Sequence, residues 1–323
     1  MSAQSHGDHH DHHDHDHDHD HAHHHDHGHD HAPKSFGAAF AVGTLLNLGL
    51  VVGQIVFGLA ANSVALLADA AHNFGDVLAL LLAWGAAWLG QQSPSTRRTY
   101  GWGRSSILAA LINAVVLLVG AGAIAVEALH RLQDPGPVGG MTVIFVGLAG
   151  IVINGFTAYL FSRGHDDLNI RAAFVHMVSD AAVSLGVVLA AGGILLTGWL
   201  WLDPLASLLI VAAIILGTWG TLRDAVNLAM DGVPTRIAHD DVQAHLRALP
   251  DVIEVHDLHI WGLSTTQIAL TAHLVRGDTG DDQAMILAAV RGLKQKFAID
   301  HATLQVETAA SAEICALRPA HVV

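Results

Sequence analysis

Two apolar stretches of the chain each carry a histidine and an aspartate four residues apart. His72 and Asp76 lie in the first stretch, and His176 and Asp180 repeat the spacing in the second. Residues four apart stack on one face of a helix, so each helix would present one imidazole and one carboxylate on the same side. Packed together, the two faces would offer a complete ligand set for tetrahedral Zn2+. Two ionised aspartates would also balance the charge of the ion in a low-dielectric interior.

One such pair alone could be a hydrogen bond across a helix interface, but its repetition favours a metal site. Asp69, three residues before His72, is predicted to support the site or its entrance rather than to bind metal directly. Asn47 and Gln54 are expected to face the same polar seam, where Asn47 would be another supporting residue. Ordinary hydrogen bonding between helices is the favoured interpretation for Asn47 and Gln54.

The composition predicts a membrane protein. Hydrophobic residues make up 52% of the 323 residues, charged residues 14%, and the mean hydropathy is +0.43. About 20 apolar residues suffice to cross the hydrocarbon core as a helix. The predicted spans are 37–60, 64–90, 106–129, 141–162, 172–198 and 204–222.

The loops predict the orientation of these spans. The loop 91–105 carries three arginines and the loop 163–171 carries two, whereas the loops on the opposite side contain no Lys or Arg, although Arg131 lies next to one of them. Because cytoplasmic loops are enriched in Lys and Arg, both termini are expected in the cytoplasm, with the protein in the cell (inner) membrane. The first 31 residues have no apolar core region, so no cleavable signal peptide is expected.

The N-terminal segment is a histidine and aspartate tract. Residues 1–31 contain fifteen His and eight Asp, with no Lys or Arg. A segment this polar cannot bury a core, and its side chains are metal ligands, so we expect a disordered metal collector. The alternatives are an expression tag, which the alternating Asp and His disfavour, and a solvating tail without function.

The C-terminal part predicts a small soluble α+β domain. Helical and alternating patterns follow one another in the order αββαβ. The expected fold class is therefore an α-helical membrane protein with six transmembrane helices and a ferredoxin-like C-terminal domain. The expected parts are a tail (1–33), a transmembrane domain (34–225), a linker (226–234), a cytoplasmic domain (235–308) and a C-terminal tail (309–323). The single cysteine, Cys315, excludes an intrachain disulfide.

The sequence resembles the cation diffusion facilitators, close to the zinc, cobalt and cadmium resistance branch. The resemblance covers about 34–308 and is carried by the segments SVALLADAAHNFGDVLAL, TYGWGR, His176-Met-Val-Ser-Asp180 and VHDLHIWGLSTTQIALTAHLV. It implies a homodimer that exchanges metal for protons across the membrane, with His72, Asp76, His176 and Asp180 as the transport site. Two histidines there favour zinc, with Cd2+ and Co2+ as further substrates.

The resemblance also implies accessory metal ligands in the C-terminal domain. These are His239, His256, His273 and a carboxylate near Glu307. Gln305 stands where some relatives have His, and the loop 91–105 lacks the His that relatives use for a further metal, with Gly103 in its place. The alternative for the domain's histidines is that they simply face solvent. His259 and Trp261 are expected to pack around the sheet. Cys315 is expected to be a thiol that binds no metal. His165 is expected to be a solvated loop residue.

Two other functions compete with transport. An intramembrane zinc protease needs an open metal position and typically an H-E-x-x-H string, which the sequence lacks, so no enzymatic activity is expected. A membrane-anchored metal buffer or sensor would explain the tail and the C-terminal domain, but it gains nothing from ligands inside the membrane. The expected partners are a second copy of the chain, divalent metal ions, protons and the lipid bilayer, and no nucleic acid.

Overall fold

The computed structural model describes residues 38–161, 168–277 and 281–319. Six long apolar helices come first, and five of them are long and apolar enough to cross a membrane, with the described apolar part of the first, Thr44–Ala60, somewhat shorter. The helices are α1 (Ala38–Ala60), α2 (Val64–Gly90), α3 (Ser105–Gln133), α4 (Gly140–Phe161), α5 (Leu168–Thr197) and α6 (Leu202–Ala229). These bounds lie within a few residues of the predicted spans, except that α6 continues seven residues beyond the predicted end.

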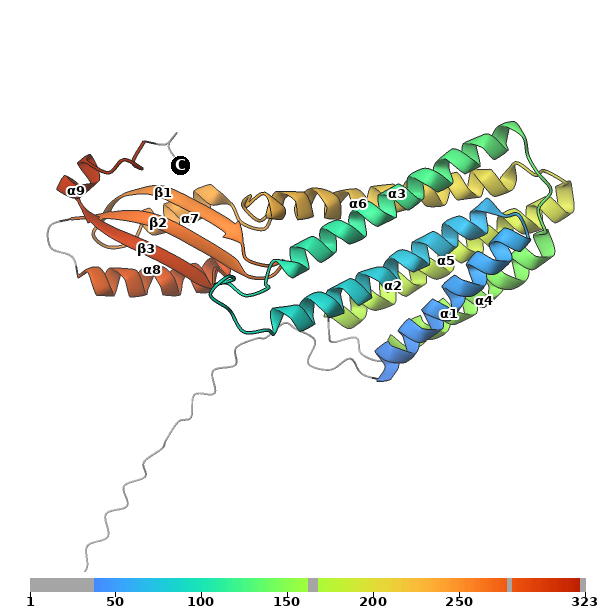
Figure 1. Ribbon diagram of the computed structural model, residues 1–323, viewed down its shortest axis with the longest axis horizontal. Coiled ribbons are helices and arrows are strands. Elements are labelled where there is room, and N and C mark those ends of the chain that lie inside the picture. The colour runs from blue at the N-terminus through green and yellow to red at the C-terminus, as the bar shows by residue number, and fades with distance from the viewer. Residues whose placement is uncertain (1–37, 162–167, 278–280, 320–323) are drawn as a thin grey trace, which may run out of the picture. The chain divides into compact units, whose positions relative to one another are not determined.

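The membrane helices pack through small side chains. Helices α4 and α5 lie side by side, as do α3 and α6 (Figure 1). The buried centre includes Ala61, Ala65, Ala68, Ala121 and Ala191. Small residues let helix backbones approach closely where lipid gives no hydrophobic drive for association. Large apolar side chains such as Leu45 and Leu189 point outward and are 68% and 66% exposed, as expected for a surface that faces hydrocarbon.

The N-terminal end of α2 is held by an aspartate from α6. The hydroxyl of Ser63 and the backbone N–H groups of Val64 and Ala65 all donate to the carboxylate of Asp203. Ser63 Oγ in turn accepts from the N–H of Leu66. A carboxylate is favourable at a helix N-terminus because it satisfies free N–H groups and complements the helix dipole. Since Asp203 is 2% exposed, this cap fixes α2 to α6 at a buried point.

The C-terminal part is a three-stranded sheet packed against helices. Its elements are α7 (His239–Arg247), β1 (Val252–Gly262), β2 (Ile268–Arg276), α8 (Asp282–Phe297), β3 (His301–Thr308) and α9 (Ala309–Glu313). The strand order is β1-β2-β3, with β1 and β2 antiparallel and β2 and β3 parallel. The order of elements through β3 is the predicted αββαβ order.

The strand alternation separates a core face from a polar face. Leu270, Ala272 and Leu274 of β2 point into a core that includes Met285, Ala289 and Leu293 of α8. Residues at odd positions of β2 therefore lie on the opposite face. His273 is one of these, and its partners across the sheet are His256 on β1 and Gln305 on β3. The sheet thus gathers several metal-ligating side chains on the face away from α8.

Candidate metal centre

The predicted membrane ligands meet where α2 and α5 pack together. His72 Nε2 lies 3.1 Å from Asp180 Oδ1, and His176 Nε2 lies 3.2 Å from Asp76 Oδ1. A second carboxylate oxygen, Asp180 Oδ2, lies 3.8 Å from His176 Nε2. Each histidine therefore pairs with the aspartate of the other helix. In a tetrahedral zinc site with nitrogen and oxygen ligands, neighbouring ligand atoms are about 3.3 Å apart, so the two crossed pairs already have this spacing.

The carboxylate oxygens without hydrogen-bond donors, and the uneven burial of the four side chains, suit a cation that enters from one side. The ligand atoms of His72, Asp76 and Asp180 lie within 4.8 Å of one another. Among the described residues, Asp76 Oδ2 and Asp180 Oδ2 are buried without a hydrogen-bond donor. The side chain of Asp180 is fully buried, whereas His72, Asp76 and His176 are 25%, 23% and 43% exposed. A partly open rim and a closed base would let an ion enter and then be held away from lipid.

Asp69 lies in a separate buried network beside this site. It accepts hydrogen bonds from Gln54 Nε2 at 2.6 Å and from Ser184 Oγ at 2.9 Å, and Asn73 Nδ2 lies 3.4 Å from its other oxygen. Asn73 also donates to Gln54 Oε1 at 3.0 Å, so the network joins α1, α2 and α5. All four side chains are fully buried. Asp69 accordingly has the surroundings of a supporting residue, and Gln54 forms the interhelical hydrogen bond that was expected.

Two members of this network, Asn73 and Ser184, were not predicted from the sequence. Asn73 follows Asp69 by four residues and Ser184 follows Asp180 by four, so extending the same spacing along each helix would have found both. Asn47 is buried, but its Oδ1 has no partner among the described residues, and no hydrogen bond joins it to Asp69.

Four metal-ligating side chains gather on the polar face of the sheet. His256, His273, Glu307 and Cys315 place one ligand atom each within 4.8 Å of the others. His273 Nδ1 lies 3.0 Å from Glu307 Oε1 and 3.7 Å from Cys315 Sγ, and His256 Nε2 lies 3.4 Å from Glu307 Oε2. The thiol was not expected to take part. It reaches the cluster because α9 and the residues after it fold back against the sheet.

Buried polar atoms without partners mark this cluster as a site for a cation. His256 and Glu307 are 8% and 5% exposed. Both ring nitrogens of His256 and Glu307 Oε2 lack a hydrogen-bond partner within the described part of the chain. Gln305 donates to Glu307 Oε1 at 2.7 Å and so orients this carboxylate. Two imidazoles, a carboxylate and a thiol are ligand types that zinc takes in proteins.

The remaining predicted residues lie elsewhere. His239 is 42% exposed at the start of α7 and contacts Asp240 at 3.3 Å, so within one chain it does not join the cluster. His259 pairs with Asp257 at 2.9 Å. The histidine and aspartate tract (1–31) and His165 lie outside the described residues.

A salt bridge fastens the segment that carries Cys315. Arg318 donates two hydrogen bonds to the carboxylate of Glu254 on β1, at 2.8 Å and 3.1 Å. This guanidinium lowers the pKa of Glu254 below its ordinary value. The chain is therefore held on both sides of Cys315: α9 packs against the sheet before it, and the salt bridge of Arg318 follows it.

Comparison with known families finds two domains, one over the long apolar helices and one over the C-terminal sheet and its helices. The cation efflux transmembrane domain matches residues 40–228, and the cytoplasmic domain of cation efflux proteins matches residues 234–309. The chain belongs to the cation diffusion facilitator family. This confirms the resemblance seen in the sequence, as the structure confirms the fold class of a helical membrane part followed by a small α+β part.

Several curated relatives of this cation diffusion facilitator are named as metal transporters. The "Zinc transporter ZitB" of Escherichia coli (strain K12) is 33% identical over 265 residues, which cover 81% of this chain and 84% of that protein. The "Cadmium, cobalt and zinc/H(+)-K(+) antiporter" of Bacillus subtilis (strain 168) is 32% identical over 271 residues, 82% of this chain and 87% of that protein. The "Metal cation efflux system protein CzcD" of Cupriavidus metallidurans is 33% identical over 261 residues, 80% of this chain and 83% of that protein. The protein is therefore an integral membrane protein of a metal efflux family.

Proposed function

We propose that this protein exports Zn2+ from the cytoplasm in exchange for protons, with His72, Asp76, His176 and Asp180 as the transport site. The observation that carries the proposal is the crossed pairing of two histidines and two aspartates between α2 and α5. Four protein ligands saturate zinc and leave no open position for a catalytic water, so the site suits a carried ion and not an enzyme.

The charges of the site support exchange with protons. Two ionised aspartates cancel the charge of Zn2+, but without metal they would leave two negative charges in a medium of low dielectric. Metal needs neutral imidazole, so protons and zinc compete for the same ring nitrogens. When zinc leaves, protons on the two histidines restore neutrality, and the site can return across the membrane loaded with protons. Two protons for each Zn2+ would make the exchange electroneutral.

Transport in proteoliposomes tests this proposal. Zinc flux into vesicles should follow an imposed pH gradient, and its apparent zinc affinity should fall as the pH drops through about 6 to 7, where free imidazole titrates. Asp180→Asn should abolish the flux because it removes a ligand and one balancing charge. Asp224→Asn, the same exchange at an exposed residue of α6, is the matched control and should transport normally. A buffer or sensor would bind zinc without moving it, and flux indifferent to pH would reject proton exchange.

The C-terminal cluster supports an accessory zinc site. We propose that His256, His273 and Glu307 bind zinc together with the thiolate of Cys315. His239, which is exposed and apart from the cluster in one chain, remains a candidate ligand across a homodimer interface. Zinc bound per full-length chain should fall by one in His273→Ala, while His301→Ala, at an exposed position of β3, is the control within the same sheet. Unchanged stoichiometry in His273→Ala would contradict the site.

The orientation and the tail complete the proposal. The arginine-rich loop and both termini lie in the cytoplasm, and the fifteen histidines of residues 1–31 raise the local zinc concentration there. Cd2+ and Co2+ are the further substrates to test, because curated relatives are named for them.

A further inference from the structure

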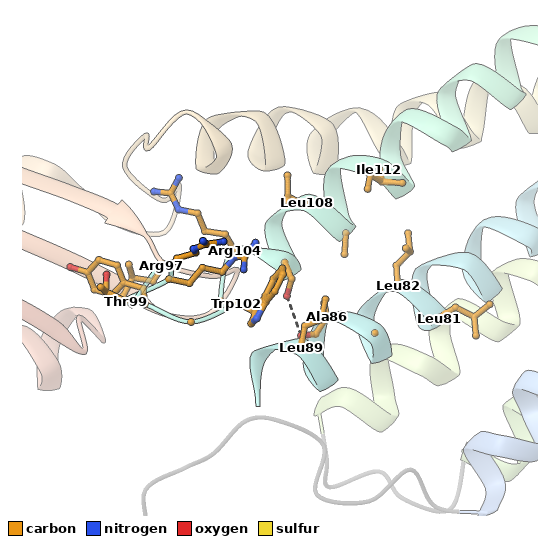
Figure 2. Close-up of a pocket in the computed structure, with 18 residues that line it drawn as sticks. Leu81, Leu82, Ala86, Leu89, Arg97, Thr99, Trp102, Arg104, Leu108 and Ile112 are labelled. Carbon is orange, nitrogen blue, oxygen red and sulfur yellow. Dashed lines mark hydrogen bonds between the residues drawn. The ribbon is translucent and has the colours of Figure 1, made fainter. Parts of the chain in front are cut away.

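A pocket with an apolar wall and a basic mouth lies where α2 and α3 meet the loop between them. Its volume is about 730 Å3. Figure 2 shows leucines of α2 and α3 and Ile112 along one part of it, and Arg97, Arg104 and Trp102 of the loop at the other. The pocket is distinct from both metal clusters, because none of the proposed ligands lines it.

The apolar wall is open to the side. Leu81 of α2 and Leu108 and Ile112 of α3 line the pocket and are 56%, 54% and 50% exposed. Since both helices belong to the membrane part, these side chains face the hydrocarbon of the bilayer. Gly85 lies in the same wall, and a Cβ atom added there would meet nothing within 4 Å. The wall is therefore a groove that an acyl chain can enter from the membrane.

The basic mouth has unpaired positive charge. The segment 91–104 contains three arginines and no acidic residue. Arg104 pairs with Asp231, whereas Arg97 and Arg98 have no carboxylate partner in the ranges that the structure describes. The guanidinium of Arg98 lies over the ring of Trp102, with its central carbon 3.8 Å from the ring centroid. Stacking on its face leaves the N–H edge of the guanidinium free, and this edge matches the oxygens of a phosphate.

Exposed aromatic residues place the mouth at the depth of lipid headgroups. Trp84 and Trp88 near the end of α2 are 61% and 58% exposed, and Trp102 of the loop is 37% exposed. Trp and Tyr concentrate at the membrane interface because one end of the ring is apolar and the other polar. The apolar groove therefore begins below the headgroups, and the arginines lie beside them.

We propose that this pocket binds one anionic phospholipid of the leaflet on the loop side. Its phosphate contacts Arg97 and Arg98, and an acyl chain lies along Leu81, Leu108 and Ile112. The other occupant available to the arginines is the acidic tract of residues 1–31. That tract contains almost no apolar side chain to cover the groove, so it fits only half of the pocket.

Lipid binding to the purified full-length chain tests the proposal. The apparent dissociation constants of phosphatidylglycerol and phosphatidylcholine are measured in detergent by native mass spectrometry. Both lipids offer a phosphate to the arginines, but the choline cation of phosphatidylcholine is repelled by them. The wild type should therefore bind phosphatidylglycerol at least about tenfold more tightly. The double variant Arg97→Gln/Arg98→Gln should lose this preference. Arg223→Gln, at an exposed arginine of α6 outside the pocket, is the charge-matched control and should keep it.

A second pair of variants tests the apolar half without changing charge. Gly85→Leu fills the groove and should weaken binding of phosphatidylglycerol. Gly120→Leu on α3, where a Cβ atom also has free space but outside the pocket, should not. Equal melting temperatures of these variants in phosphatidylcholine would exclude misfolding as the cause.

Three outcomes would overturn the proposal. The first is equal affinity for the two lipids, or a preference that survives Arg97→Gln/Arg98→Gln. The second is displacement of phosphatidylglycerol by an equal concentration of inorganic phosphate, which would make the mouth a site for free anions. The third is binding that appears only after deletion of residues 2–31, which would make the acidic tract the resident occupant. None of these measurements depends on zinc transport, so failure here is distinct from failure of the proposed function.

Discussion

At the scale of residues, the membrane site is defined by which histidine meets which aspartate. The sequence predicts that each helix presents one histidine and one aspartate on the same face, without predicting which of them contact each other. In the structure, His176 Nε2 is nearer to Asp76 of α2, at 3.2 Å, than to Asp180 of its own helix, at 3.8 Å. Residue spacing gives the face on which each side chain lies. It does not give the axial offset of α2 against α5, which depends on packing of the whole bundle, and the crossed pairing depends on that offset.

Changing one imidazole should change metal selectivity. In His72→Asp the flux of Cd2+ relative to Zn2+ should increase, because a carboxylate can bind through one or two oxygens and so weakens the preference for tetrahedral geometry, which suits the larger Cd2+. The measurement is competition between the two ions in proteoliposomes. His130→Asp, at an exposed histidine of α3, is the matched control. An unchanged ratio in His72→Asp would count against His72 as a direct ligand.

The network around Asp69 should be sensitive to one methyl group. A Cβ atom at Gly150 of α4 would lie 2.8 Å from Ser184 Oγ, so Gly150→Ala should push this hydroxyl away from Asp69. Losing a hydrogen bond to a buried charged group costs about 1–3 kcal/mol, and we expect a comparable loss in the free energy of unfolding.

The control for this change lies on the same helix. Gly155→Ala places a Cβ atom in open space and should leave stability unchanged or slightly raised, because alanine favours the helix. Thermal unfolding of the two variants in the same detergent is the measurement. If Gly150→Ala is as stable as Gly155→Ala, Ser184 does not support Asp69 in the way described.

At the scale of elements, hydropathy located the membrane helices well and their ends less well. The predicted span 64–90 coincides with α2, whereas the span predicted to end at residue 222 belongs to a helix that continues to Ala229. Hydropathy detects the part of a helix that lies in hydrocarbon, but it does not detect polar turns of the same helix that continue into water. The predicted order αββαβ held because strand alternation and helix periodicity are local signals.

The contribution of Cys315 could not be foreseen because it depends on a short element beyond the last strand. Helix α9 begins with a capping box in which Thr308 and Ser311 satisfy each other's backbone N–H groups. This cap turns the chain back over the polar face of the sheet. The residue types of this cap do not specify that the following thiol reaches His273.

Releasing this returning segment should weaken the accessory zinc site. Arg318→Gln removes the salt bridge to Glu254 and should raise the zinc dissociation constant of the site up to about fivefold, the range of an exposed ion pair. Cys315→Ser, which removes the ligand itself, should have a larger effect. Arg291→Gln at an exposed position of α8 is the control, and zinc titration of the full chain at pH 7 is the measurement. Equal affinities in all three variants would place the metal elsewhere.

The pH range of this effect follows from the pKa of Glu254. The folded value is lowered by Arg318, so the salt bridge is fully formed above the ordinary carboxyl pKa of about 4.5 and is lost as the pH falls through the lower folded value. The difference in the free energy of unfolding between Arg318→Gln and the wild type, measured without metal, should therefore persist at neutral pH and vanish in strong acid.

At the scale of the whole molecule, the histidine and aspartate tract should affect how much zinc reaches the transporter and not the rate of the transport step. Deleting residues 2–31 should leave the maximal rate nearly unchanged and raise the apparent KM for zinc, because a flexible collector raises the local ion concentration without taking part in the membrane step. Zinc flux is measured against buffered free zinc. Replacing every histidine of the tract by glutamine while keeping the aspartates separates metal binding from charge. Loss of the maximal rate on deletion would make the tract part of the transport step.

The cap that Asp203 forms on α2 determines how far each part of this helix moves when the helix tilts. Because the first turn of α2 is held at a buried point, tilting α2 against α6 makes that end a fulcrum. At 1.5 Å per residue, His72 lies about 12 Å from the fulcrum and Gly90 about 39 Å. A tilt that moves the imidazole by about 1 Å therefore sweeps the far end of α2, and the pocket beside it, through about 3 Å. Small rearrangements around the ion are thus magnified at the surface next to the lipid headgroups.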